Sequence, residues 1–274
     1  MARMLIRFGQ RVLVVALGAL SVWLIVYVFR LVDRRLPSIL AVALSYAIAA
    51  YVVLPYAVLI GLKILHRRRV PSYTVTGDGL PGDPVNLILV GTMAQLHAAF
   101  TQAGWSQADR LNPISAWHMA RAFVCNSPYP TAPFSTLFLF GRGQDIGFQK
   151  QIGNSPRQRH HVRFWGKRLA REAAVGKVGF WRSAGPPPPD ARVLWIGAGT
   201  KDIGFSLTRL TFQITHATDS DTDAERDFIV DELASKKLVD GVKSYRAGQQ
   251  LPAGQVNHYI TDGEVTTAQL IVEM

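Results

Sequence analysis

The sequence predicts an α+β protein, in which a two-helix transmembrane hairpin precedes a soluble domain with an antiparallel or mixed sheet and a few helices. Three observations lead to this fold class. Two long uncharged stretches lie near the N-terminus, a turn-rich stretch follows them, and short strand-like segments dominate the rest of the chain. We therefore expect a hairpin over residues 1–69, a linker over 70–84 and a soluble domain over 85–274.

The two uncharged stretches are each long enough to cross a membrane. Val12–Phe29 runs for 18 positions without a charge and Pro37–Leu62 for 26, and a hydrocarbon core of about 30 Å needs about 20 apolar residues. A cleaved signal peptide fits the first stretch poorly, because Arg30 stands where a small residue should allow cleavage. A buried pair of globular helices is the remaining alternative. We expect spans at about 12–29 and 37–62, with both termini on one side of the membrane.

The distribution of charge separates the membrane-flanking residues from the rest. The net charge of +11 at first suggests a nucleic-acid-binding protein. Residues 1–69 contain ten of the 30 Lys and Arg but only one of the 19 Asp and Glu. Nine of the 11 excess positive charges therefore belong to the apolar N-terminal part. For this reason we expect no nucleic-acid partner. Seven basic residues flank the outer ends of the hairpin and three lie in its loop. By the positive-inside rule the soluble domain is therefore cytoplasmic, with the periplasm as the open alternative.

Beyond the linker, hydrophobic periodicity predicts a mixture of helices and strands. Apolar residues at helical spacing predict helices over 92–103, 114–124 and 223–236. Short or alternating apolar runs predict strands, and Asp262-Gly263 predicts a hairpin turn near the C-terminus. The expected strands are 86–91, 136–140, 146–150, 161–165, 192–197, 203–208 and 210–216.

One internal repeat stands out in the predicted strand region. Gly141-x-Gly143-x-Asp145-Ile146-Gly147-Phe148 recurs as Gly197-x-Gly199-x-x-Asp202-Ile203-Gly204-Phe205, and each copy follows an apolar strand. Two copies of a strand-turn-strand unit predict pseudo-symmetric hairpins, with glycines where the chain needs positive φ or a close backbone approach. Asp145 and Asp202 either cap these turns or belong to a functional site.

Six segments of the soluble domain carry a resemblance to a known family. They are Gly82–Gly91, Ala103–Trp105, Tyr129–Pro133, Leu137–Trp165, Gly197–Phe205 and His216–Leu233. The block GNSPRQRHHVRFW within the fourth segment is specific. Together the segments resemble the LssY-like C-terminal domain, a bacterial family whose members often carry this domain behind membrane segments. The resemblance implies a membrane context, and with the two predicted spans it leads us to expect a multi-pass protein of the bacterial inner membrane, with the lipid bilayer as a partner. It implies no particular reaction and no particular cofactor.

A basic face is the leading candidate for a binding site. If 159–165 is a strand, alternation places Arg159, His161, Arg163 and Trp165 on one face. Guanidinium groups bind phosphate and carboxylate oxygens in pairs, so this face suits an anionic lipid headgroup or a phosphorylated ligand. The predicted ligand-binding set is Arg157, Arg159, Arg163, Asn154 and Ser155. The alternative is a solvated basic edge strand, which protects a sheet from aggregation.

A membrane-tethered hydrolase is the competing hypothesis, and a structural or secretion-associated partner is a third. In the hydrolase, His161 or His216 acts as general acid or base, Asp145 or Asp202 orients it, and the arginines stabilise developing negative charge. No motif indicates a metal or a cofactor. The acidic run 219–225 lacks the glycine and glutamate of a calcium loop. It reads instead as a capping box, Thr222-x-x-Glu225, which opens the helix over 223–236.

Overall fold

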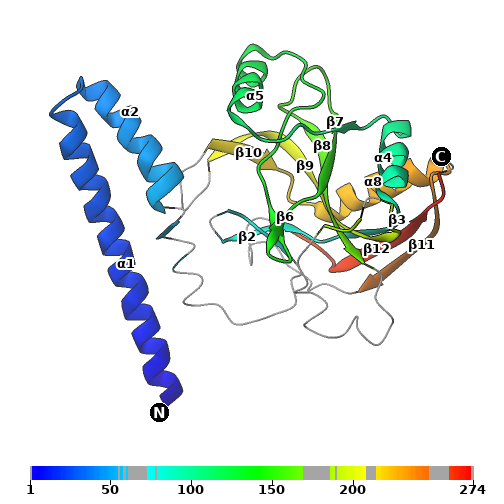
Figure 1. Ribbon diagram of the computed structural model, residues 1–274, viewed down its shortest axis with the longest axis horizontal. Helices are drawn as coiled ribbons and strands as arrows, with labels where there is room; N and C mark the ends of the chain where they lie inside the picture. Colours follow the sequence, from blue (N-terminus) through cyan, green and yellow to red (C-terminus); the bar gives the residue numbers. More distant parts are fainter. Residues whose placement is uncertain are drawn as a thin grey trace. The chain divides into compact units, whose positions relative to one another are not determined.

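The computed structural model describes residues 2–54, 56–57, 60, 73–77, 79–168, 186–188, 190–207, 214–246 and 259–272. The chain divides into two compact units (Figure 1). The first contains the N-terminal helices together with Thr76–Leu80 and Ser206–Thr215, and the second is the sheet-rich domain. The α+β class predicted from the sequence is confirmed.

The N-terminal unit consists of apolar helices. Helix α1 spans Ala2–Asp33, and helix α2 spans Ser38–Ile48 and continues as the π-helical turn η1, Ala49–Val53. Within α1, Val12–Asp33 has a mean hydropathy of 2.7 and is 6% buried, so it is long and apolar enough to cross a membrane. It is the one such helix among the described residues. A second span over 37–62 is not confirmed, because the apolar helix Ser38–Val53 is shorter and much of 55–62 lies outside the described residues.

The main sheet has eight strands in the order β11-β12-β3-β9-β8-β7-β4, with β10 paired to β9. Along this order of seven strands, neighbours are antiparallel except β12 and β3, so the sheet is mixed, as predicted. The long central pair β8–β9 is in continuous register from Arg159↔Asp202 to Arg168↔Val193. The strands are β3 Leu87–Gly91, β4 Ser106–Gln107, β7 Ile146–Gln151, β8 Arg159–Arg168, β9 Val193–Leu207, β10 Ile214–Thr218, β11 Val239–Arg246 and β12 Glu264–Leu270.

A four-stranded sheet and three helices complete the domain. The small sheet has the order β2-β1-β5-β6, formed by Tyr73–Val75 (β1), Pro81–Pro84 (β2), Phe138–Leu139 (β5) and Arg142–Gly143 (β6). The helices are α4 Met93–Gln102, α5 Pro113–Cys125 and α8 Thr222–Ser235. Thr92 and Asn112 cap α4 and α5, each accepting hydrogen bonds from the exposed amides of the first turn.

The core lies on both faces of the main sheet. On one face, Phe100 of α4 and Ile229 of α8 join Phe148 and Phe164 in an apolar cluster. On the other face, Trp165 of β8 packs with Leu137, Leu139 and other residues of the small-sheet region. Because side chains alternate along a strand, the odd-numbered residues of β8 from Arg159 to Trp165 all face this second layer.

The second copy of the predicted repeat differs from the structure. Gly141 lies in the turn between β5 and β6 with φ 78°, but Gly197 and Gly199 lie within the uninterrupted strand β9. The two copies are therefore not equivalent hairpins. The β9 glycines are required by packing, because a Cβ on Gly197 would lie 2.7 Å from Phe164 and one on Gly199 2.7 Å from Ile229. The sequence predicted glycines either for positive φ or for a close approach of the backbone to other atoms. The close approach is confirmed at Gly197 and Gly199.

The predicted capping box and C-terminal turn are also corrected. Asp221, one residue earlier than expected, caps α8 by accepting from the amides of Asp223 and Ala224. Glu225 is buried and contacts His160 instead of the cap backbone. Asp262-Gly263 directly precedes β12, and Asp262 accepts from Arg226 of α8, so this pair is no two-residue turn between β11 and β12.

Candidate functional site

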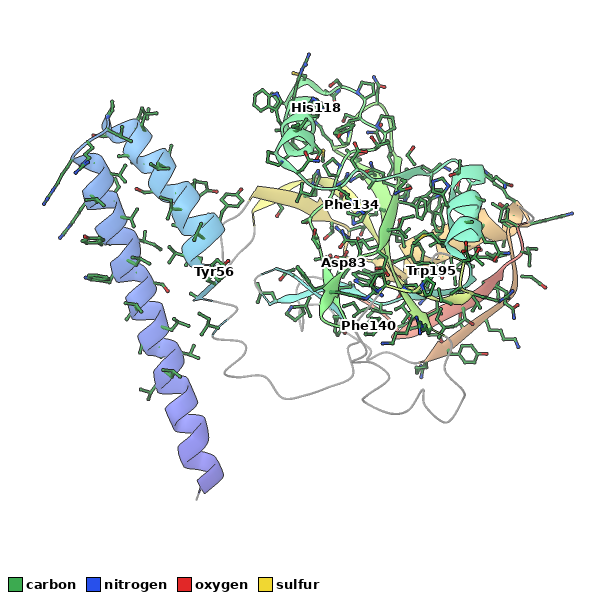
Figure 2. All side chains as sticks on the ribbon, viewed as in Figure 1. Tyr56, Asp83, His118, Phe134, Phe140 and Trp195 are labelled. Carbon is green, nitrogen blue, oxygen red and sulfur yellow. The ribbon has the colours of Figure 1, made fainter. Side chains whose placement is uncertain are left out.

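The predicted basic face is buried and central. Arg159, His161 and Arg163 are 1%, 2% and 5% exposed, and β8 lies between β7 and β9. The interpretation of this segment as a solvated edge strand is therefore wrong. Phe134 covers the three side chains, with its ring 4.5 Å from the Arg163 guanidinium carbon and 5.4 Å from the His161 ring centre. Figure 2 marks Phe134 and Asp83 in the sheet-rich domain.

Arg159 is held by hydrogen bonds from two of its three guanidinium nitrogen atoms. Its Nε donates to Asp202 Oδ2 at 2.8 Å, across the β8–β9 pair. Its Nη1 donates to Gln149 Oε1 at 2.7 Å and to the carbonyl oxygen of Ala132 at 3.2 Å. A charged group this deeply buried is tolerated only when it is paired and hydrogen-bonded, and both conditions are met here.

Arg163 forms a second ion pair, with Asp83 of β2. Arg163 Nη1 lies 2.5 Å from Asp83 Oδ2, and the Tyr259 hydroxyl donates to Asp83 Oδ1 at 2.8 Å. Burial and the adjacent Asp83 carboxylate raise the pKa of Tyr259 well above its ordinary value, so the phenol keeps its proton. Neither Asp83 nor Tyr259 was among the site residues predicted from the sequence.

His161 connects the two ion pairs. Its Nε2 lies 2.8 Å from Thr200 Oγ1, and its Nδ1 lies 3.5 Å from Asp202 Oδ2. Burial lowers the pKa of His161 well below its usual value, so the ring is neutral near pH 7. Burial alone would raise the pKa of Asp202, but His161 and Arg159 together bring it to about 2. The Thr200 hydroxyl also lies 3.4 Å from Asp83 Oδ2 and has one proton to donate, so the tautomer of His161 decides whether Thr200 donates to His161 or to Asp83.

His216 of β10 belongs to the same electrostatic environment. It interacts with Asp202, Arg159 and Arg163, and burial lowers its pKa. Its ring meets Phe123 edge-on at 5.6 Å. Three buried nitrogen atoms here have no hydrogen-bond partner among the described residues, namely His216 Nε2, His161 Nδ1 and Arg163 Nε. We call the whole group the buried polar cluster: Asp83, Arg159, His161, Arg163, Thr200, Asp202, His216 and Tyr259.

Comparison with known proteins gives a family for the chain. The family model described as the LssY C-terminus matches residues 67–265. The chain belongs to the LssY C-terminus family. Every residue of the buried polar cluster lies within the matched range. No curated protein and no solved structure matches the sequence. The resemblance seen in the sequence is thereby confirmed, and the sheet-rich unit is an LssY domain.

The remaining predicted site residues lie apart from the buried polar cluster of the LssY domain. Asp145 forms an ion pair with Arg142 and accepts from the Gly166 amide at 2.7 Å. Arg157 donates to the carbonyl oxygens of Phe123 and Val124, at 2.8 and 3.1 Å, and so closes the end of α5. Thus three of the four predicted catalytic residues come together with two of the three predicted arginines.

Asn154 and Ser155 lie in the loop between β7 and β8. Asn154 is exposed, and Ser155 is buried, with its hydroxyl accepting from the Arg157 amide at 3.4 Å. Neither residue contacts the buried polar cluster through any described hydrogen bond.

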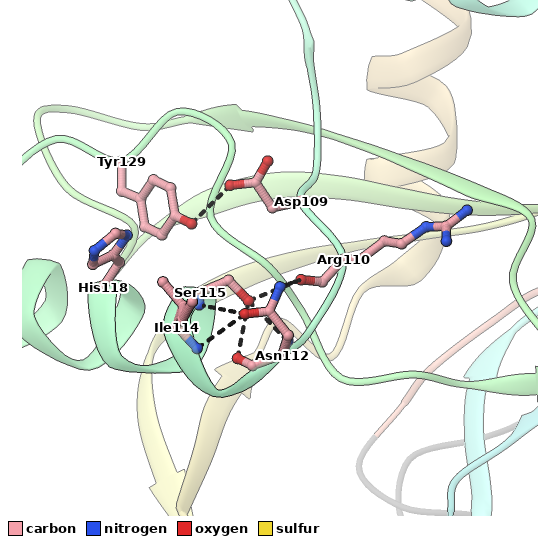
Figure 3. Close-up of a pocket in the computed structure, with 7 residues that line it drawn as sticks. All are labelled: Asp109, Arg110, Asn112, Ile114, Ser115, His118 and Tyr129. Carbon is pink, nitrogen blue, oxygen red and sulfur yellow. Dashed lines mark hydrogen bonds between the residues drawn. The ribbon is translucent and has the colours of Figure 1, made fainter.

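The LssY domain also has a shallow hollow beside the start of α5 (Figure 3). It has a volume of about 310 Å³ and is lined by Asp109, Arg110, Asn112, Ile114, Ser115, His118 and Tyr129. The Tyr129 hydroxyl donates to Asp109 at 2.7 Å, and burial and this carboxylate raise the pKa of Tyr129 to about 12. Asn112 and Ser115 in its lining form the helix cap, and none of the lining residues belongs to the buried polar cluster. Among the described residues, no group of three or more His, Cys, Asp or Glu is placed to hold a metal ion.

Proposed function

We propose that this protein is a membrane-associated LssY-family member whose buried polar cluster binds one anionic group, a phosphate or a carboxylate. The observation that supports this is the set of three unpartnered nitrogen atoms on His161, Arg163 and His216. A buried polar atom without a partner costs about 1–3 kcal/mol, so three in one cluster require a common explanation. An oxygen-rich ligand supplies acceptors for all of them.

The charge of the cluster determines how an anion binds. Asp202 already neutralises Arg159, and Asp83 neutralises Arg163. With both histidines neutral, the cluster has almost no net charge. An added anion therefore favours protonation of His216, which is the less buried of the two imidazoles, and binding is coupled to the uptake of a proton.

The apolar part of α1, Val12–Asp33, supports the proposed membrane association. We further propose that α2 and the residues after it form a second span, so that the protein is multi-pass in the inner membrane with the LssY domain in the cytoplasm. Seven basic residues at the outer ends of the hairpin, against three in its loop, support this orientation. An anionic lipid headgroup and a soluble phosphorylated compound present the same chemistry to the cluster.

Thermal denaturation of the full-length chain in detergent tests the proposal. The ligands are inorganic phosphate, a phosphomonoester, acetate and phosphatidylglycerol. We expect at least one of them to raise the melting temperature of the wild type and to have no effect on His216→Phe, which keeps the ring contact with Phe123. His97→Phe is the matched control, because His97 is exposed and outside the cluster. Equal responses in the wild type and His216→Phe would show that the ligand binds elsewhere.

A hydrolase is the second candidate, and one observation favours it. The arrangement of a carboxylate, an imidazole and a hydroxyl resembles a catalytic triad and is formed by Asp202, His161 and Thr200. His161 Nδ1 lies 3.5 Å from Asp202 Oδ2, and its Nε2 lies 2.8 Å from Thr200 Oγ1. His161 would accept the hydroxyl proton while Arg163 stabilises developing negative charge. Thr200 is fully buried, as are His161 and Arg163, so burial does not separate the two candidates; the hydrolase ranks second because it leaves the unpartnered nitrogen atom of His216 without an explanation. The test is the hydrolysis of nitrophenyl esters or nitrophenyl phosphates. If the wild type and Thr200→Ser hydrolyse them and Thr200→Val does not, the hydrolase becomes the first candidate.

A purely structural role is the third possibility. It predicts that no anion changes the melting temperature and that no ester is hydrolysed, while cluster substitutions still destabilise the domain.

A further inference from the structure

Helix α5 buries one narrow stripe and leaves the opposite face uncovered. Ser115 and Ala122 are its buried residues, at 5% and 5% exposure. On the other side, Ile114, Trp117 and Val124 are 70%, 69% and 76% exposed. Residues spaced by three, seven or ten positions lie on one face of a helix, so these three large apolar side chains form a single exposed ridge.

Basic residues accompany this ridge. His118 and Arg121 are exposed on the same side of the helix, and Arg110 lies just before it. The helix contains no acidic residue. The nearest acidic side chain before it, Asp109, accepts hydrogen bonds from Tyr129 and Thr131. The outer face of α5 therefore combines apolar and cationic groups, which is the composition of helices that lie in a membrane interface.

We propose that the outer face of α5, defined as Ile114, Trp117, His118, Arg121, Val124 and Cys125, binds the surface of an anionic lipid bilayer. The inference rests on the membrane association proposed above, because a chain anchored by α1 keeps its LssY domain close to lipid at all times. Tryptophan prefers the level of the headgroups, and basic residues are attracted to an anionic surface. A second copy of the chain is a less suitable occupant, because a symmetric contact would place Arg121 of one copy near Arg121 of the other. An anionic surface complements the positive charge of Arg121.

The chain carries its own reporter for this contact. Cys125, its single cysteine, is exposed at the end of α5 and lies on the proposed face. An environment-sensitive fluorophore on Cys125 of the full-length protein, incorporated into lipid nanodiscs, reports the polarity around the helix. The discs contain either phosphatidylcholine alone or phosphatidylcholine with phosphatidylglycerol, each with and without nitroxide-labelled headgroups.

We expect a blue shift and strong nitroxide quenching in discs with the anionic lipid, and weaker effects in the uncharged discs. The double substitution Ile114→Glu/Trp117→Glu should abolish both effects. The matched control is Val242→Glu/Tyr245→Glu on β11, which removes two other exposed apolar side chains and should change neither. Far-ultraviolet circular dichroism of both variants confirms that each is folded.

Four results would overturn the inference. A fluorophore that stays solvent-exposed while the protein co-purifies with the discs means that α5 does not contact lipid, although membrane association stands. A protein that fails to co-purify with the discs shows that membrane association itself is wrong. A blue shift that depends on protein concentration and not on lipid composition identifies a second copy of the chain as the occupant. Equal loss of signal in the test and control variants removes α5 as its source.

Discussion

His161 and Thr200 occupy directly paired positions on β8 and β9, and a hydrogen bond of 2.8 Å joins His161 Nε2 and Thr200 Oγ1. Thr200 is fully buried, and the opposite ring nitrogen of His161 faces Asp202 at 3.5 Å. This arrangement holds the ring of a neutral histidine in one orientation in the middle of a sheet. It also joins the Arg159–Asp202 ion pair to the Arg163–Asp83 ion pair. A substitution at one position should therefore change the interaction energies of the other residues of the cluster.

Replacement of Thr200 tests this hydrogen bond. Thr200→Val keeps the shape of the side chain but leaves His161 Nε2 without a partner, so we expect a loss of about 1–3 kcal/mol in the free energy of unfolding. Thr200→Ser retains the hydroxyl and should lose less. Chemical denaturation of the full-length protein in detergent measures both values, and a Thr200→Val protein as stable as the wild type would contradict the assigned bond.

Stability should fall in mildly acidic solution. Burial lowers the pKa values of His161 and His216 below the ordinary value of 6.5, so the unfolded chain takes up protons that the folded chain does not. Their contribution is complete above about pH 6.5 and declines below it, by up to about 1.4 kcal/mol per pH unit for each histidine. Thermal denaturation between about pH 7.5 and about pH 5 tests this, and His216→Phe should have the shallower slope. A melting temperature that rises on acidification would mean that the histidines are charged in the folded protein.

The Asp83–Arg163 pair should behave as a unit. Removing one partner leaves the other charged and buried, so Asp83→Leu or Arg163→Met alone should cost about 3–5 kcal/mol. The double variant should be more stable than the sum of the single effects predicts, because neither charge is then left alone. Unfolding free energies of the four proteins form the cycle, and additive losses would show that the two side chains do not interact.

Arg157 should contribute to stability and not to the binding of an anion. Its guanidinium donates to two carbonyl oxygens at the end of α5, so Arg157→Ala should destabilise the protein by about 0.5–1.5 kcal/mol. We expect the shift in melting temperature caused by a bound anion to be unchanged. An anion response lost in Arg157→Ala at unchanged stability would restore Arg157 to the ligand-binding set.

The sequence predicts some of this site well, and the reason is local. Alternation along β8 correctly placed Arg159, His161 and Arg163 on one face, because the side-chain period of a strand is two wherever the strand lies. Alternation says nothing about what covers that face. Phe134 and Asp83 reach it from segments distant in the sequence, so its burial could not be foreseen from residues 157–165.

Other differences arise where two local solutions have similar energies. Asp221 and Thr222 are both suitable N-cap residues. A capping box at Thr222 needs the side chain of Glu225, but Glu225 contacts His160 on β8 instead, and Asp221 forms the cap. The two glycine motifs look alike in sequence, yet one turns at Gly141 and the other continues as β9. Packing of β9 against Phe164 and Ile229 accounts for Gly197 and Gly199 without a turn.

The most direct test of anion binding in the buried polar cluster is calorimetric titration of the full-length protein with sulfate, whose own charge does not change near neutral pH. The account predicts an affinity that rises as the pH falls from about 7.5 to about 5.5, by up to tenfold per unit for one proton taken up. His216→Phe should remove this dependence. Sulfate that does not bind, or that binds equally well at both pH values in both proteins, would contradict the account.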